Sequence, residues 1–147
     1  MTKRMNIREL VPAGYAAVSG LEKYVSAAVE PTVLELIKLR ASILNGCSFC
    51  VDMHSRDALA AGEDSRRLFG VAAWHESPLF TERERAALAL TDEVTRLGQH
   101  GVSDEVWEQA CAVWSAEEVA NLVLAAATIN VWNRIAITSR TPPPAAV

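Results

Sequence analysis

The sequence is poor in the residues and charge patterns that mark several protein classes. It has three cysteines among 147 residues, and an odd, small number of cysteines argues against a secreted disulfide scaffold. It has no excess of positive charge either, since 14 Lys and Arg face 18 Asp and Glu, a net charge of −4 with His neutral. A mildly acidic chain lacks the positive surface that binds nucleic acid or anionic lipid. We therefore expect no nucleic-acid partner and no membrane partner.

Long hydrophobic runs are also missing from the sequence. A membrane-spanning helix needs about 20 consecutive apolar residues. The longest candidate, Val119–Trp132, is shorter and contains Asn121, Thr128 and Asn130. The charged N-terminus is not followed directly by the apolar segment of a secretory signal, because proline and glycine interrupt the next stretch. We expect a cytoplasmic protein.

What the sequence does contain indicates helices. Hydrophobic residues make up 50% of the chain, and its length suits one domain with an adequate core. No segment alternates convincingly as a strand, whereas Ala, Leu, Glu and Arg are abundant. We predict a single all-α domain, with its core over about residues 30–138 and a proline-rich, flexible tail over residues 139–147.

Capping residues give the expected helix limits. Capping boxes at Thr81–Glu84 and Ser115–Glu118 each start a helix, and Asn45-Gly46 ends one. The last helix is apolar nearly all round, which in so short a chain predicts burial against a second subunit. The expected helices are 12–29, 31–45, 47–61, 63–69, 81–97, 103–113 and 115–137, with a loop through Trp74, His75 and Pro78.

Cys47, Cys50 and His54 form the most informative pattern in the chain. Spacings of three and four residues place side chains on one face of a helix. The partial positive charge at a helix N-terminus favours a thiolate, which is both a nucleophile and the form that reacts with peroxide. A second thiol within reach converts a sulfenic acid into a disulfide. The pattern indicates a dithiol/disulfide redox centre with His54 as proton acceptor.

Glu35 lies on the preceding predicted helix, twelve residues before Cys47. If Asn45-Gly46 turns the chain into a helical hairpin, Glu35 can face His54. A carboxylate in that position would orient the imidazole ring and raise its basicity. The alternative is an ordinary surface ion pair between Glu35 and Lys38 or Arg40.

Glu35, then Cys47-Ser48-Phe49-Cys50, then His54 resembles the core motif of the alkylhydroperoxidase D-like (AhpD-like) family of the carboxymuconolactone decarboxylase superfamily. Residues 40–54, Trp74 and residues 81–90 and 129–134 are also similar to it. The resemblance implies an all-helical homotrimer or homohexamer that reduces hydroperoxides. It implies that Cys50 attacks the peroxide, that Cys47 resolves the product, and that His54 and Glu35 relay the proton.

The resemblance also implies that no cofactor is bound and that an external dithiol, of the lipoyl or thioredoxin type, supplies electrons. Phe49 departs from the family pattern, because some peroxidases of the family carry a histidine directly before the second cysteine. Comparison with thioredoxin would make Cys47, the more N-terminal cysteine, the attacking thiol.

Four other functions remain open at this point. The cysteines could serve a non-catalytic redox sensor or a disulfide oxidoreductase. Cys47, Cys50 and His54 could bind zinc, with Cys111 or Glu35 as a fourth ligand. A lyase that acts on a lactone is the last, although decarboxylases of the superfamily generally lack Cys-x-x-Cys.

Several further residues have expected positions in the core, in a loop or beside the site. We expect Cys111 in the core and His75 in a loop, with the entrance of the site as the alternative. Asn130, Asn133 and Arg134 either border the pocket or an interface, or form the polar edge of a buried helix.

Overall fold

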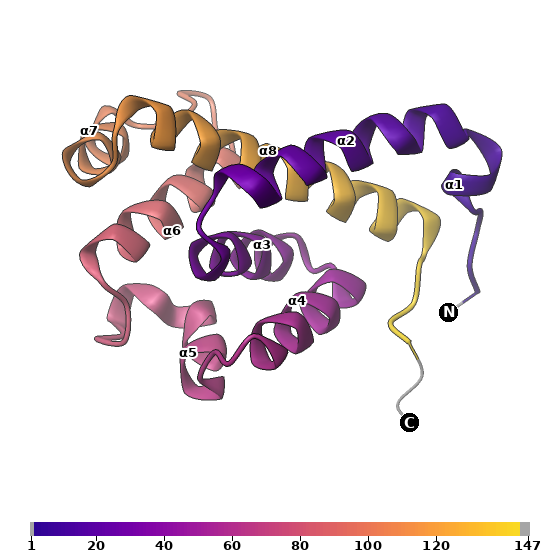
Figure 1. Ribbon diagram of the computed structural model, residues 1–147, viewed down its shortest axis with the longest axis horizontal. Coiled ribbons are helices and arrows are strands. Elements are labelled where there is room, and N and C mark those ends of the chain that lie inside the picture. Colours follow the sequence, from indigo (N-terminus) through magenta and orange to yellow (C-terminus); the bar gives the residue numbers. More distant parts are fainter. Residues whose placement is uncertain (1, 145–147) are drawn as a thin grey trace.

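The computed structural model describes residues 2–144, and the chain folds there as a single all-α domain, as predicted (Figure 1). Residues 145–147 of the predicted tail lie outside the described residues. The helices are α1 (Ile7–Leu10), α2 (Pro12–Ala28), α3 (Pro31–Asn45), α4 (Ser48–Ala60), α5 (Ser65–Gly70), the 3-10 helix η1 (Val71–Glu76), α6 (Glu82–Thr95), α7 (Asp104–Val113) and α8 (Ala116–Ser139).

The local sequence sets the helix ends that matter for the site. Both predicted capping boxes form, between Thr81 and Glu84 at the start of α6 and between Ser115 and Glu118 at the start of α8. Gly46 has φ 68°, ψ 33° and ends α3 in the left-handed conformation that glycine adopts at little cost. This turn leads directly into α4, so that α3 and α4 form the predicted hairpin.

Helix α3 lies in the middle of the molecule and packs against α4, α6 and α8 (Figure 1). Ile37 belongs to a hydrophobic cluster shared with α2, α6 and α8. Leu36 and Leu39 belong to a second cluster shared with α4, α5, η1 and α6. Because α3 contributes to both clusters, its charged residues Lys38 and Arg40 are buried as well.

Residues 71–76 form the helix η1, where the sequence analysis predicted a loop. The cause is a long-range contact. The buried guanidinium of Arg40 donates to the carbonyls of Val71 and Ala72, at 3.2 and 2.9 Å, and to the carboxylate of Asp92, at 2.6 Å through Nε. These bonds fix the carbonyls of η1, and no local sequence signal reports them.

The packed domain begins earlier than residue 30, the predicted boundary of the core. Val25 of α2 is fully buried and Val29 nearly so, and α2 contacts α8 along much of its length. At the other end, Ser139 is the last residue of α8 and is buried, so it belongs to the helix rather than to the tail.

Helix α8 is longer than the apolar run found in the sequence. At 24 residues, with a stretch of mean hydropathy 1.2, it is long and apolar enough to cross a membrane, but half of that stretch is buried inside the domain. The single chain does not bury this helix on all sides, since Leu124, Val131 and Ile137 are 37–44% exposed. The homo-oligomer inferred from this helix stays a prediction.

Candidate active site

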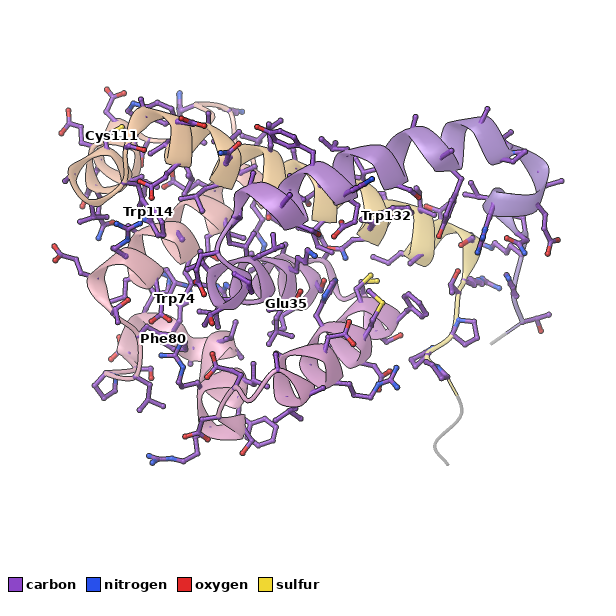
Figure 2. All side chains as sticks on the ribbon, in the orientation of Figure 1. Glu35, Trp74, Phe80, Cys111, Trp114 and Trp132 are labelled. Carbon is purple, nitrogen blue, oxygen red and sulfur yellow. The ribbon has the colours of Figure 1, made fainter. Side chains whose placement is uncertain are left out.

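The α3–α4 hairpin brings Glu35 and His54 together. The Oε2 atom of Glu35 lies 2.9 Å from Nδ1 of His54. Figure 2 shows Glu35 on α3, near the middle of this view. His54 is 5% exposed, so water competes little for this contact. An imidazole whose Nδ1–H is held by a carboxylate has Nε2 free to accept a proton.

Both cysteines of the Cys-x-x-Cys are free thiols and are almost completely buried, Cys47 at 1% and Cys50 at 2% exposure. Cys50 is the third residue of α4 and precedes His54 by one turn, as predicted. The sequence analysis predicted Cys47 on the same helical face as Cys50 and His54, and this is wrong, because Cys47 precedes the helix. It has an extended backbone and is the N-cap residue of α4.

The two thiols have very different acidities. The pKa of Cys47 falls from 9.0 to about 7, chiefly because the Cys50 thiol hydrogen-bonds to it. Burial opposes this effect, and the backbone N–H groups of Cys50 and Phe49 and the Asn133 amide add to it. The pKa of Cys50 is raised, first by the hydrogen bond that its thiol donates to Cys47, then by burial and by the Cys47 charge. Cys47 is therefore the more acidic thiol of the pair.

Burial alone would raise the pKa of Glu35, but its contacts outweigh burial and the pKa lies below the ordinary 4.5. The hydrogen bond and charge of His54 come first, and Lys38 follows. Lys38 Nζ lies 3.6 Å from Glu35 Oε1 and 2.6 Å from Glu22 Oε1. The sequence analysis considered His54 and Lys38 as rival partners of Glu35, and the structure has both.

A buried amide network supports the cysteines from the side of α8. Asn133 is fully buried, donates to Ser42 Oγ at 3.0 Å, and accepts from Asn45 at 2.8 Å. It also interacts with both thiols and lowers the pKa of each. The sequence analysis missed Ser42 and Asn45 as site residues, since only the fold connects them to the cysteines through Asn133. Asn133 therefore borders the site, one of its predicted places.

Cys50 and His54 open into one cavity of about 550 Å³. Glu35 and Lys38 line it as well. Its apolar walls are Met5, Ile7, Tyr15, Phe49, Met53, Trp132, Ile135 and Ala136. Residues 3–8 form one edge, which is held to α8 by a backbone bond from Arg4 N to Ser139 O of 2.9 Å.

Cys47 lines a different cavity, of about 410 Å³, between the start of α4 and the end of α8. Phe49 lines both cavities. Of the two thiols, it is therefore Cys50 that shares a cavity with His54 and Glu35.

Comparison with known proteins shows the family. The family model described as carboxymuconolactone decarboxylase family matches residues 9–93. The chain belongs to the carboxymuconolactone decarboxylase family. The AhpD-like resemblance predicted from Glu35, the two cysteines and His54 is confirmed by this match and by the Agrobacterium structure described next.

Two relatives match this family member over nearly its whole length. Uncharacterized protein YdfG of Bacillus subtilis is 37% identical over 138 residues, which are 93% of this chain and 94% of YdfG. The crystal structure of ATU0492 from Agrobacterium tumefaciens, of unknown function but suggested to be the antioxidant defence protein AhpD, is 40% identical. It covers 99% of this chain and 100% of its own, with a TM-score of 0.95.

A more distant structural relative is the debrominase Bmp8, at 21% identity, a TM-score of 0.80, and coverage of 91% of this chain and 73% of its own. That likeness shows the fold alone. The carboxymuconolactone decarboxylase fold thus occurs in proteins with different reactions, so that function must be argued from the site.

Two residues singled out in this family member lie away from the site. Cys111, predicted in the core, is exposed on α7, at the far end of the molecule from Glu35 (Figure 2). His75 is 62% exposed, stacks on Trp74 and lies 3.3 Å from Asp92, so it does not form the entrance of the described cavity.

The zinc alternative finds no support in the arrangement of side chains. Over residues 2–144, no three His, Cys, Asp or Glu side chains are grouped so that they could hold a metal ion. His54 turns its Nδ1 to Glu35, and the two thiols turn to each other and to Asn133.

Proposed function

We propose that this protein is a thiol-dependent peroxidase that reduces organic hydroperoxides with its Cys-x-x-Cys dithiol. The observation that carries the proposal is that Cys50 and His54 line one cavity and that Glu35 holds His54 at 2.9 Å. The apolar walls suit the organic part of a hydroperoxide. The suggested antioxidant role of the Agrobacterium relative agrees with this reading.

In the proposed reaction Cys50 attacks the peroxide. The Cys50 thiol gives its proton to His54, and the thiolate then attacks the outer peroxide oxygen, so that the O–O bond breaks. The products are Cys50 sulfenic acid and an alkoxide, which takes the proton back from His54 and leaves as an alcohol. Glu35 stabilises the imidazolium while it carries that proton.

Cys47 completes the proposed reaction as the resolving thiol. Its thiolate attacks the sulfur of Cys50 sulfenic acid, a disulfide forms, and hydroxide leaves and is protonated to water. In the reduced pair the pKa of Cys47 is about 7, so that about half of this thiol is ionised at neutral pH before the reaction begins. One hydroperoxide and two thiols thus give one alcohol, one water and one disulfide. An external dithiol of the lipoyl or thioredoxin type then restores both thiols, without a bound cofactor.

The sulfenic acid identifies the attacking cysteine. We expect Cys47→Ser to accumulate sulfenic acid on Cys50 after one equivalent of cumene hydroperoxide, detected by a dimedone adduct on the intact protein. Cys50→Ser should form none and should consume no hydroperoxide with dithiothreitol present. Cys111→Ser is the matched control, because it removes an exposed cysteine away from the cavity, and should behave as wild type. An adduct on Cys47 in Cys50→Ser would reverse the roles, and equal turnover in all variants would exclude the peroxidase.

A disulfide oxidoreductase is the second candidate, and one observation favours it. The acidic thiol is Cys47, the more N-terminal of the pair, as in the thioredoxin comparison. Such an enzyme would reduce a model disulfide by way of a mixed disulfide on Cys47. Turnover of 5,5′-dithiobis(2-nitrobenzoate) at substoichiometric protein, together with slow consumption of hydroperoxide, would favour this candidate over the first.

Assembly and location belong to the proposal as well. We propose a homotrimer or homohexamer that covers the exposed apolar residues of α8, namely Leu124, Val131 and Ile137. We propose the cytoplasm as its location. Sedimentation equilibrium of the purified protein tests the assembly.

A further inference from the structure

We infer that Lys38 and Glu22 are positioning residues of this site: Lys38, anchored by Glu22, holds Glu35 ionised and turned toward His54. The inference rests on the proposed proton relay but concerns two residues outside it. The pair joins α2 to α3 and thereby connects the relay to a helix that carries neither cysteine nor His54.

The contacts form a continuous chain of charges that alternate in sign. Trp132 Nε1 of α8 donates to Glu22 Oε2 at 3.0 Å, and Glu22 Oε1 lies 2.6 Å from Lys38 Nζ. Lys38 Nζ lies 3.6 Å from Glu35 Oε1, and the other oxygen of that carboxylate is the one on His54. Each carboxylate of the chain uses both oxygens, so that its orientation is fixed from two sides.

Burial shows why this chain is more than a surface ion pair. The Lys38 side chain is 7% exposed, and those of Glu22 and Glu35 are 29% and 22% exposed. A buried ammonium is costly unless it is paired, and pairs shielded from water interact more strongly than exposed ones. Lys38 is therefore confined to the space between its two carboxylates, where it acts on Glu35 throughout the reaction.

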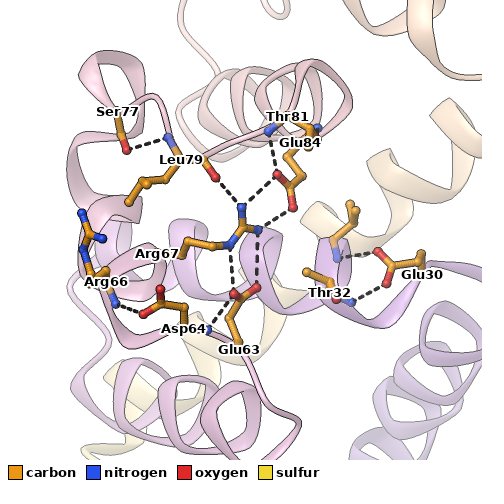
Figure 3. Close-up of polar contacts among 11 residues, drawn as sticks. Glu30, Thr32, Glu63, Asp64, Arg66, Arg67, Ser77, Leu79, Thr81 and Glu84 are labelled. Atoms are coloured by element: carbon orange, nitrogen blue, oxygen red, sulfur yellow. Dashed lines mark hydrogen bonds and ion pairs between the residues drawn. The ribbon is translucent and has the colours of Figure 1, made fainter.

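Other charged residues lie around Glu35, but none of those that the structure describes is paired with it directly. Lys3 and Arg8, from the N-terminal segment and α1, and Asp57, from α4, line the same cavity. Glu35 also lines a further cavity of about 410 Å³, distinct from the one that Cys47 lines, and Glu63 and Glu84 line it too. Figure 3 shows that Arg67 binds both of those carboxylates, with Nε 2.9 Å from Glu63. His54 and Lys38 are thus the cations paired directly with Glu35 among the described residues.

The shared ammonium makes two opposite predictions. Removing the Lys38 charge takes a cation from Glu35 and should raise its pKa, because an opposite charge at this distance favours the ionised form. Neutralising Glu22 takes away the competing carboxylate and leaves the whole ammonium to Glu35. The pKa of Glu35 should then fall. A merely structural pair would move both variants in the same direction, through loss of packing.

The decisive measurement is the carbon-13 NMR titration of the Glu35 carboxyl, assigned by its disappearance in Glu35→Gln. We expect Lys38→Met to raise the midpoint by about one pH unit, Glu22→Gln to lower it, and Lys38→Arg to stay near wild type. Arg56→Met is the matched control, because it removes an exposed cation on the same helix as His54, and should leave the midpoint unchanged. The acid limb of the pH–rate profile for hydroperoxide consumption should move with each midpoint.

An unchanged midpoint in Lys38→Met, or shifts of the same sign in Lys38→Met and Glu22→Gln, would overturn the inference. If Lys38→Met does not fold, the sign of the shift in Glu22→Gln decides. The titration needs no turnover, so a protein without peroxidase activity but with opposite shifts would refute the proposed function and keep the positioning pair.

Discussion

Glu35 Oε2 lies 2.9 Å from His54 Nδ1, although the two residues are 19 positions apart and on different helices. The turn at Gly46 makes this contact possible, because it folds α4 back along α3. Such a contact fixes both the orientation of the imidazole and the nitrogen that is free to accept a proton. The predictions below follow from it and from the contacts around it.

Glu35→Gln should slow oxidation of the dithiol by cumene hydroperoxide by about 10²-fold, the lower end of what a positioned acid–base group supplies. An amide at this position keeps the shape but does not stabilise an imidazolium. The measurement is the loss of free thiols over time at pH 7. A rate equal to wild type would contradict the relay.

The ionisation of Glu35 should also determine how the oxidation rate of the wild-type protein falls at low pH. The pKa of Glu35 is lowered below 4.5, with His54 and Lys38 outweighing the effect of burial. Glu35 therefore stays ionised as the pH falls to its ordinary value, and it becomes protonated only below it. We expect that protonation of Glu35 reduces the oxidation rate only below pH 4.5, provided that the protein remains folded there. If Glu35→Gln kept the wild-type rate at pH 7, the charge of Glu35 would not be needed, and its protonation could not explain a fall of the rate in acid.

Cys50→Ala should raise the pKa of Cys47 from about 7 toward 9.0, because the Cys50 thiol is the largest cause of its acidity. The thiolate is followed by its absorbance at 240 nm across pH 5–10, as the difference from a variant that lacks both cysteines. Cys111→Ser, as a background for all samples, removes the exposed thiol from the signal. A midpoint that stays near 7 would assign the acidity of Cys47 to the start of α4 instead.

Asp92→Asn should lower the free energy of unfolding by about 3 kcal/mol, because it leaves the buried guanidinium of Arg40 without its counter-charge. Asp92 also accepts from Trp74 Nε1 at 3.2 Å, so that α3, α6 and η1 all loosen. Urea denaturation measures the change. Arg56→Ala, at an exposed pair, should cost less than about 1 kcal/mol. A similar small loss in Asp92→Asn would mean that the network contributes little.

Stability should fall in acid partly through Glu84. Burial would raise the pKa of this carboxyl, but Arg67 and the N-cap Thr81 outweigh burial and lower it below 4.5. A carboxyl whose pKa is lower in the folded state stabilises the fold above its ordinary pKa, and this stabilisation is lost as the pH falls through the folded value. Urea denaturation from pH 7 to pH 3 should show the decline, and Arg67→Met should make it shallower. Parallel declines in the two proteins would exclude this pair as a cause.

Local signals in the sequence were enough for most of the fold. Capping boxes and Gly46 act within a few residues, and for this reason the ends of α3, α6 and α8 were predictable to within two residues. The helix η1 was not, because Arg40 holds it from 31 residues away. Exposure was harder to predict. Cys111 lies on α7, and only packing reveals that its side faces solvent.

The site was predictable where spacing carries the information. Cys50 and His54 follow from helical periodicity, and the contact of Glu35 with His54 follows from a hairpin that closes at Gly46. Lys38 looked like a surface partner of Glu35 because a sequence does not show that α3 is covered on both sides. Glu22 and Asn133 come from helices that meet the site only in three dimensions, and no spacing links them to Cys50.

The backbone bond between Arg4 and Ser139 brings the two ends of the described chain together at one edge of the cavity. A fluorescent protein fused directly before residue 4 or directly after residue 139 would therefore lie at this edge of the cavity. The same proximity favours circular permutation, since a short peptide could join the segments that contain Arg4 and Ser139. New termini could be placed in the exposed turn between α6 and α7, at residues 97–101. A tag attached there would not lie at this edge of the cavity.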